Sequence, residues 1–281
     1  MISIITPVYN GESFIESCIK VVIEQNCPDI EHIIVDGGSQ DKTIAVVKKY
    51  AENYPHIRWI SEADQGQSDA MNKGIKMAKG EILAILNVDD YYQPNVLNRV
   101  QTIFENLPKN SFLVGNCKVW DETGKVKFIN RPEKLKLKEL LLGWSINPHP
   151  INPAAYFYHK SLHDDIGLYD VDDHYTMDVD FLLRVVQTAN LQYKDEIWGN
   201  YLDIEGTKTF SDRESGQGVK RMENLFNKYN QQLSFLEKLQ VKVKGYWFKK
   251  VWSKVEYFER HPDEIPSVII QKINVFTKPN S

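Results

Sequence analysis

The chain has 281 residues and a formal net charge of −4, and 42% of its residues are hydrophobic. This length suits one large α/β domain with an appendage, and the small negative charge gives no reason to expect a nucleic acid as a partner. Its three cysteines, which form no CxxC spacing, exclude a cysteine-rich zinc site and favour a reducing compartment. We see no signal peptide and no apolar run of the ~18 residues that a membrane span needs, so we expect a cytoplasmic protein.

Strands and helices alternate through the first hundred residues. Short apolar runs predict strands at 2–6, 31–35, 57–61 and 81–88. Amphipathic patterns between and after them predict helices at 14–23, from 41, at 68–78 and from 94. Such alternation is typical of a parallel sheet that is covered by helices on both faces.

The pattern changes after residue 106. Strands are predicted at 112–120, 125–129 and 154–158, and helices at 135–142 and 178–189. From residue 215 the pattern is helical almost to residue 257. We therefore divide the chain into a catalytic domain at 1–214, with halves at about 1–106 and 107–214, and a helical C-terminal extension at 215–281.

Acidic side chains follow several of the predicted strands. The apolar run that starts at Leu83 ends in Asp89 and Asp90, while Asp36 and the segment 62–64 follow two other strands. Parallel sheets bind ligands at the carboxyl ends of their strands, and paired carboxylates there suit a divalent cation that is shared with a diphosphate. The alternative is a set of ordinary turns with solvated acids. The first loop, 6–11, lacks the GxGxxG pattern of dinucleotide-binding proteins.

Four ordered motifs carry a resemblance to a known family. The segments 4–10 (IITPVYN), 33–43 (IIVDGGSQDKT), 64–75 (DQGQSDAMNKGI) and 86–90 (LNVDD) closely resemble those of family 2 glycosyltransferases of the GT-A fold. The resemblance covers roughly residues 1 to 210. It implies a Rossmann-like, mostly parallel sheet with helices on both faces. It also implies an enzyme that moves a sugar from a nucleoside-diphosphate sugar, with a UDP-sugar expected first, to an acceptor hydroxyl with inversion.

The resemblance also assigns the donor site. Asp36 would read the base, and Asp89 would ligate Mn²⁺ or Mg²⁺ with support from Asp90. Asn87 stands where many members have Asp, so the affinity for the metal would be lower. The residues that would bind the nucleotide-sugar are Thr6, Pro7, Tyr9, Asn10, Asp36, Asp64, Asp69, Asn72, Asn87 and Val88.

The remaining chemistry is assigned to the second half of the chain. Asp178 matches the position of the general base, with Met177 in place of the family's Glu; the alternative for Asp178 is a helix N-cap. The residues expected near the acceptor or the diphosphate are His149, Asp180, Arg184 and Lys208. His149 is as well explained as a loop residue without a function, and Arg184 as the partner of a nearby carboxylate.

The segment 238–258 is basic and aromatic. Between residues 238 and 254 it has six lysines and no acid, interleaved with aromatic residues. Such a helix is typical of a membrane interface, so the protein would lie at the inner face of the membrane and act in polysaccharide or glycolipid assembly on a saccharide or lipid-linked acceptor. Alternatively, the segment packs on the catalytic domain through an apolar stripe, formed by the residues that recur every fourth position: Leu239, Val243, Trp247, Val251 and Val255. Asn87 and Met177 leave a catalytically silent nucleotide-sugar-binding protein as the other functional alternative.

Overall fold

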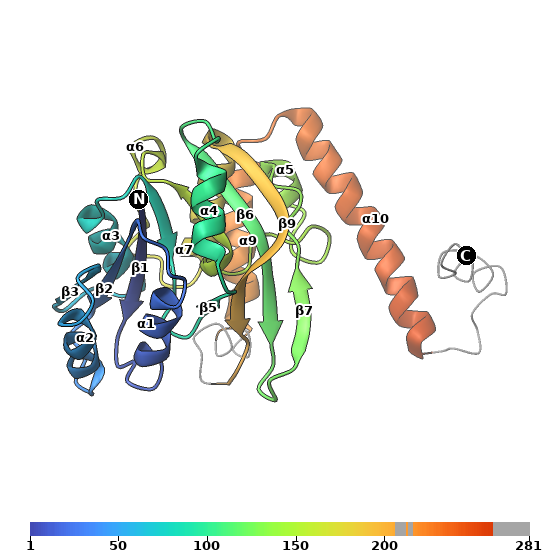
Figure 1. The fold of residues 1–281 in the computed structure, drawn as a ribbon. Coiled ribbons are helices and arrows are strands. Elements are labelled where there is room, and N and C mark those ends of the chain that lie inside the picture. Colours follow the sequence, from blue (N-terminus) through green and yellow to red (C-terminus); the bar gives the residue numbers. More distant parts are fainter. Residues whose placement is uncertain (206–211, 213–215, 261–281) are drawn as a thin grey trace, which may run out of the picture. The chain divides into compact units, whose positions relative to one another are not determined.

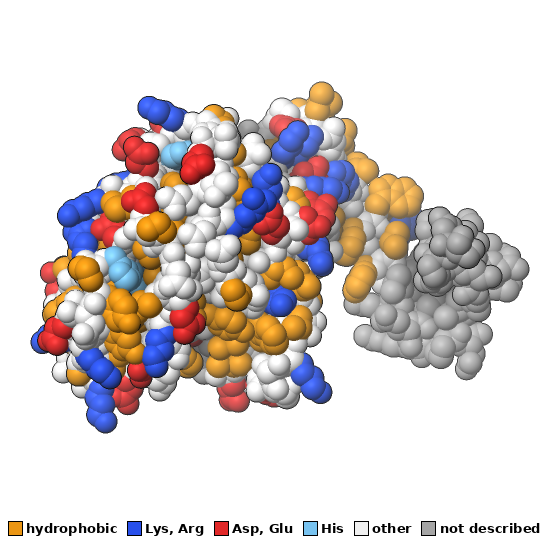
Figure 2. Space-filling view, in the orientation of Figure 1, with side chains coloured by type: hydrophobic (Ala, Val, Ile, Leu, Met, Phe, Trp, Pro, Cys, Tyr) orange, Lys and Arg blue, Asp and Glu red, His pale blue; other side chains and the backbone are white. Residues whose placement is uncertain are grey.

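The computed structural model describes residues 1–205, 212 and 216–260, and in the last helix it describes side chains as far as residue 252. The chain forms two compact units, Met1–Gln232 and Leu233–Ser281. Basic, acidic and apolar side chains are interspersed over the face of the first unit that Figure 2 shows.

The first half of unit 1 alternates strands and helices as predicted. The elements are β1 (Ile2–Val8), α1 (Ile15–Ile23), β2 (Ile30–Asp36), α2 (Thr43–Ala51), β3 (Ile57–Ser61), α3 (Gln67–Met77) and β4 (Ile82–Ile85). Their strands pair in parallel in the order β3-β2-β1-β4 (Figure 1). Every residue of β1, β2 and β4 is buried. Strand β4 is wholly apolar, whereas β2 also buries the polar side chains of Glu31, His32 and Asp36.

Helices cover both faces of this parallel half. On one face, Cys18 of α1 and Leu97 of α4 (Val96–Phe104) pack in one cluster with Ile4. On the other face α3 approaches the sheet closely, because a Cβ at Gly74 would lie 2.4 Å from Cγ2 of Ile5. The absence of a side chain at Gly74 therefore sets the distance between α3 and β1.

The second half extends the sheet with antiparallel strands. It contains β5 (Tyr91–Tyr92), β6 (Ser111–Trp120), β7 (Val126–Asn130), α5 (Leu137–Leu140), a 3₁₀ turn at Pro153–Ala155, β8 (Tyr156–His159), α6 (Leu162–Ile166), α7 (Met177–Thr188), β9 (Asn190–Leu202) and α9 (Gln217–Asn230). The sheet continues from β4 as β8-β6-β9-β5, with β7 beside β6. Strand β8 is antiparallel to β4 and β6. The α/β class with a GT-A-like sheet is confirmed, and the parallel pairing that we predicted is concentrated in its first half.

Strand β9 was not predicted from the sequence. It pairs with β6 in parallel through register shifts near Asn116, and it is only partly buried along most of its length. Charged residues at 194–196 interrupt its apolar pattern. A strand with this exposure has no regular alternation to detect.

The described part of unit 2 contains one long helix, α10 (Phe235–Arg260). Its start is stabilised by a reciprocal cap, in which Ser234 N donates to Glu237 Oε2 at 3.1 Å and Glu237 N donates to Ser234 Oγ at 3.4 Å. Among the described helices, none has the combination of length and apolar character required to cross a bilayer.

Candidate active site

A cavity of about 1070 Å³ lies at the carboxyl ends of β1 and β4. Residues of α7 and α9 also line it. A strand edge of this kind is where open α/β sheets bind ligands. The predicted residues that line the cavity are Pro7, Tyr9, Asp64, Asn87, Val88, Asp89, Asp90, His149 and Asp178. The fold therefore brings the segment with the paired acids and the segment of the expected base to one site.

Asp36 does not line this cavity. Its side chain is fully buried, and its Oδ2 accepts hydrogen bonds from the backbone N–H groups of Gly38 and Ser39, both at 3.0 Å, and from Ser61 Oγ at 2.7 Å. Its Oδ1 accepts from Ser39 Oγ. The carboxylate thus holds the loop after β2 to the end of β3, and direct reading of a base by Asp36 is not supported.

The cavity wall next to Asp36 is formed by the following residue, Gly37. A Cβ on Gly37 would lie 2.6 Å from Oδ2 of Asp64. Asp64 itself accepts from the N–H of Gly66 at 2.8 Å. The absence of a side chain at residue 37 is what allows Asp64 to reach this part of the cavity.

Thr6 and Asn10 lie beside the site without lining it. Thr6 Oγ1 is buried at 2.9 Å from Nε2 of His32. Asn10 joins two loops, since its N–H donates to Ser39 Oγ at 2.7 Å and its Oδ1 accepts from Gln40 N at 2.9 Å. Thr6 therefore contacts the neighbouring strand β2, and Asn10 fixes the loop that carries Tyr9.

Asp69 and Asn72, on α3, also point elsewhere. Asp69 accepts from Gln65 N at 3.2 Å and pairs with Lys73 at 3.4 Å. Asn72 is buried and exchanges two hydrogen bonds with the backbone of Tyr169, at 2.8 and 3.0 Å. Contact of Asn72 with a ligand is therefore not supported, and its side chain instead ties α3 to the loop before α7.

The two acids after β4 form the polar centre of the cavity. Asp90 is 3% exposed, and its Oδ2 accepts from Nδ2 of Asn87 at 2.8 Å and from Nδ2 of Asn152 at 2.7 Å. Its Oδ1 is buried and has no hydrogen-bond partner among the described residues. Burial raises the pKa of Asp89, and burial together with the charge of Asp89 raises the pKa of Asp90 well above its ordinary value.

This arrangement fits a divalent cation that brings further oxygen ligands with it. An unpartnered carboxylate oxygen and two acids with raised pKa values are what a bound cation would stabilise. Asn87 is less available as a ligand of the cation, because its Oδ1 already accepts a hydrogen bond from Gln67 Nε2 at 3.0 Å. Among the residues that the structure describes, no group of three or more His, Cys, Asp or Glu could hold a metal alone. Asp89 and Asp90 would therefore need a ligand such as a diphosphate to complete the coordination.

Asn152, the second side chain that donates to Asp90, was not predicted from the sequence. It lies 62 residues away in the chain, and its Oδ1 also accepts from Ala154 N at 2.8 Å, at the start of the 3₁₀ turn. An Asn before a Pro is read as a turn residue, and only the antiparallel pairing of β8 with β4 brings it beside Asp90.

His149 lines the cavity as a neutral side chain. Its Nδ1 is buried without a hydrogen-bond partner among the described residues. Its ring packs edge-on against the ring of Trp144, with 5.0 Å between the ring centroids. Burial lowers the pKa of His149 to about 4. The ring therefore carries no charge near neutral pH and offers a nitrogen to a ligand.

Asp178 lies in the first turn of α7 and lines the cavity. The N-cap of this helix is Thr176, so the alternative of Asp178 as the cap is not what the structure shows. Met177, where the resemblance led us to look for Glu, is buried with its sulfur 2.8 Å from Ser68 Oγ. The charge of Asp178 contributes, after burial, to raising the pKa of Tyr156.

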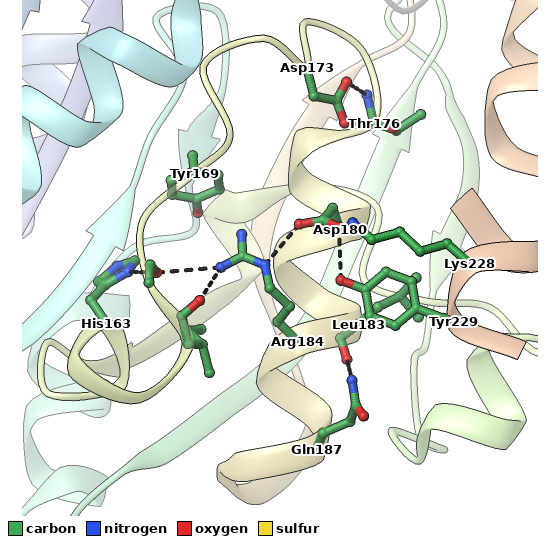
Figure 3. Close-up of polar contacts among 12 residues, drawn as sticks. His163, Tyr169, Asp173, Thr176, Asp180, Leu183, Arg184, Gln187, Lys228 and Tyr229 are labelled. Carbon is green, nitrogen blue, oxygen red and sulfur yellow. Dashed lines mark hydrogen bonds and ion pairs between the residues drawn. The ribbon is translucent and has the colours of Figure 1, made fainter. Parts of the chain in front are cut away.

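Asp180 and Arg184 do not line the cavity and instead form a polar network with residues of α9 and with the last residue of α6 (Figure 3). Arg184 Nε donates to Asp180 Oδ2 at 2.8 Å, and its other end donates to the carbonyl of Ile166 at 2.6 Å. Asp180 Oδ1 accepts from Tyr229 of α9 at 2.8 Å and lies 3.4 Å from Lys228 Nζ. The alternative in which Arg184 pairs with a nearby carboxylate is the one observed. Lys208 lies outside the described residues.

The chain is similar in sequence to known glycosyltransferases. The sequence profile of Glycosyl transferase family 2 matches residues 3–167. The uncharacterized glycosyltransferase YibD of Escherichia coli is 36% identical over 102 residues, which are 36% of this chain and 30% of that protein. A PGL/p-HBAD biosynthesis glycosyltransferase of Mycobacterium bovis is 28% identical over 219 residues, covering 76% of this chain and 82% of its own. The aligned part spans about a third of the first curated relatives.

Solved structures show the same fold. Staphylococcus aureus TarS in complex with UDP-GlcNAc matches with a TM-score of 0.61 at 20% identity, over 75% of this chain and 60% of that one. The mannosyltransferase PcManGT of Pyrobaculum calidifontis, in complex with GDP-Man and Mn²⁺, matches with a TM-score of 0.54 at 17% identity, over 73% and 56%. At these identities the likeness establishes the fold.

Proposed function

The chain belongs to glycosyl transferase family 2, and on this basis we propose that it is an inverting, metal-dependent hexosyltransferase that acts on an acceptor hydroxyl. The observation that carries the proposal is one cavity that contains both the acid pair Asp89–Asp90 and the separate carboxylate of Asp178. An inverting transfer needs these two functions, charge stabilisation at the leaving diphosphate and a base at the acceptor.

The donor is proposed to be a UDP-sugar. The Tyr9 side chain is 64% exposed at the cavity, where its ring is available to stack on a base, and Pro7 and Asp64 lie on the same wall. The complexes of TarS with UDP-GlcNAc and with UDP support a uridine nucleotide. The roles of Asn87 and Val88 would be to contact the donor near its phosphates.

Asp89 would be the main protein ligand of Mn²⁺ or Mg²⁺, and Asp90 would support it. The Mn²⁺ in the PcManGT complex is consistent with this proposal. When bound, the cation would neutralise the negative charge on the leaving diphosphate. The chain's own contribution is to hold Asp90 rigidly between two amide groups, so that the unpartnered oxygen stays in place.

Asp178 would accept the proton of the acceptor hydroxyl while the acceptor oxygen attacks the anomeric carbon. A new C–O bond to the acceptor forms as the C–O bond to the diphosphate breaks, which inverts the configuration. His149 would contact a sugar with its neutral ring. Asp180 and Arg184 would act indirectly, by fixing the helix that carries Asp178.

Cation-dependent nucleotide binding is expected to weaken as the pH falls from about 8 to about 5. The pKa values of Asp89 and Asp90 are raised, so protons compete with the cation at a higher pH than they would at exposed aspartates. Calorimetry of UDP with Mn²⁺, corrected for protonation of UDP itself, measures this. An affinity that stays constant across the range would contradict a site made of these two acids.

We also propose that segment 238–258 contacts an anionic membrane surface, which would bring the enzyme to a lipid-linked acceptor in polysaccharide or glycolipid assembly. In α10, Leu239, Val243, Trp247 and Val251 recur every fourth residue, and Lys250 lies 5.6 Å from the ring of Trp247. Apolar side chains flanked by lysines are typical of interfacial helices.

Replacing Trp247 and Trp252 by Ser is expected to lower binding to vesicles that contain phosphatidylglycerol by roughly 10-fold, because interfacial aromatic rings supply much of such binding. Co-sedimentation measures it, with Val126→Ser, an exposed apolar position on β7, as the control. Unchanged binding of the double variant, or equal binding of the wild type to uncharged vesicles, would rule out this membrane contact.

A further inference from the structure

Tyr175 is a tyrosine on the cavity wall, three residues before Asp178. Its side chain is 47% exposed and lines the cavity. The loop that carries it is fixed, since Asp173 Oδ1 accepts from the N–H groups of Tyr175 and Thr176 at 3.0 and 2.8 Å (Figure 3 shows the contact with Thr176). The ring is therefore presented to the cavity by an ordered turn.

A cation supports this ring from α9. The guanidinium carbon of Arg221 lies 4.1 Å from the centroid of the Tyr175 ring. Arg221 also donates to Gln217 Oε1 at 3.1 Å and forms an ion pair with Asp212. A guanidinium over an aromatic face is attractive and limits the motion of the ring.

Helix α9 is in turn fixed to α7. The bonds from Tyr229 and Lys228 to Asp180 join the two helices at one end (Figure 3). Met222 lies two turns before Tyr229 on the same helix face, and Met222, Gly218 and Val219 line the cavity. The network at Asp180 thus sets the register in which α9 faces the cavity and supports Tyr175.

We propose that Tyr175 binds the acceptor, by stacking its ring against the C–H face of a pyranose. Pyranose rings have an apolar face, and a partly exposed aromatic ring at a cavity wall is a matching surface. The position beside Asp178 selects the acceptor over the donor, because the base must be within reach of the acceptor hydroxyl. This inference rests on the proposed function of Asp178. Both Tyr175 and α9 lie beyond the matched residues 3–167.

The test uses the whole 281-residue chain saturated with UDP and Mn²⁺, and a panel of methyl pyranosides as probes. Saturation-transfer NMR measures pyranoside binding, and calorimetry measures UDP binding on the same samples. The wild type is expected to bind at least one pyranoside. Tyr175→Ala is expected to weaken that binding by roughly 3- to 10-fold and to keep UDP affinity, because an aromatic stacking contact is worth about that factor. Tyr175→Phe, which keeps the ring, is expected to bind like the wild type.

Tyr9→Ala provides the matched contrast, since it should weaken UDP and spare the pyranoside. The inference is overturned if no pyranoside binds the UDP-loaded wild type, if Tyr175→Ala binds it equally well, if Tyr175→Ala loses UDP, or if Tyr175→Phe is as weak as Tyr175→Ala. A wild type that fails to bind UDP at all would instead count against the proposed function. Thermal unfolding of each variant confirms that it is folded.

Discussion

Asp178→Asn is expected to lower sugar transfer by ~10²-fold or more and to leave nucleotide-sugar affinity nearly unchanged. The base acts on the acceptor, so its loss should appear in turnover and not in donor binding. Asn keeps the shape of Asp but loses its charge in the first turn of α7, which costs about 0.3–1 kcal/mol of stability. Paired calorimetry and turnover measurements test both parts of the prediction.

The matched control is Asp172→Asn, an exposed acid six residues earlier that does not line the cavity. It should transfer sugar like the wild type. Survival of turnover within a few-fold in Asp178→Asn would show that Asp178 is not the base. Asp180 would not be the next candidate, because both of its oxygens are occupied by Arg184 and Tyr229.

Asp89→Ala should abolish the part of nucleotide affinity that depends on Mn²⁺, a loss of roughly 10- to 100-fold, while the protein stays folded. The side chain lies at the cavity and not in the core, so its removal costs little packing. Calorimetry of UDP with and without Mn²⁺ separates the metal-dependent part from the rest.

Glu62→Ala is the control for this substitution, since Glu62 follows β3 as Asp89 follows β4 but does not line the cavity. In Glu62→Ala, Mn²⁺ should raise the affinity for UDP as much as it does in the wild type. If Asp89→Ala gains as much affinity from Mn²⁺ as the wild type does, the cation is held elsewhere and the assignment fails.

The parallel half of the fold could be predicted because β1, β2 and β4 are buried and mostly apolar. Asp89 and Asp90 follow the apolar run of β4 and mark the start of the site. Strand β9 could not be predicted, because its pairing with β6 tolerates charged and partly exposed residues. Its position depends on the rest of the sheet and not on its own pattern.

The site also has features that could be predicted from the sequence and features that could not. A carboxylate at a strand end is equally suited to binding a ligand and to closing a loop, and the local sequence does not reveal that the hydroxyls of Ser39 and Ser61 donate to Asp36. Asn152 and the wall formed by α9 reach the cavity only through long-range contacts, at Asp90 and Asp180. Residues that reach the site through long-range contacts cannot be identified from the sequence around them.

The most direct test of the proposed transferase activity is release of nucleoside diphosphate from a panel of UDP-, GDP- and dTDP-sugars, measured with and without Mn²⁺. We predict release from at least one donor, strongest among UDP-sugars, that requires the cation and is lost in Asp89→Ala. A protein that binds such donors tightly in the presence of Mn²⁺ but releases no nucleoside diphosphate from any of them would contradict the proposal, and would instead be a nucleotide-sugar-binding protein without transferase activity.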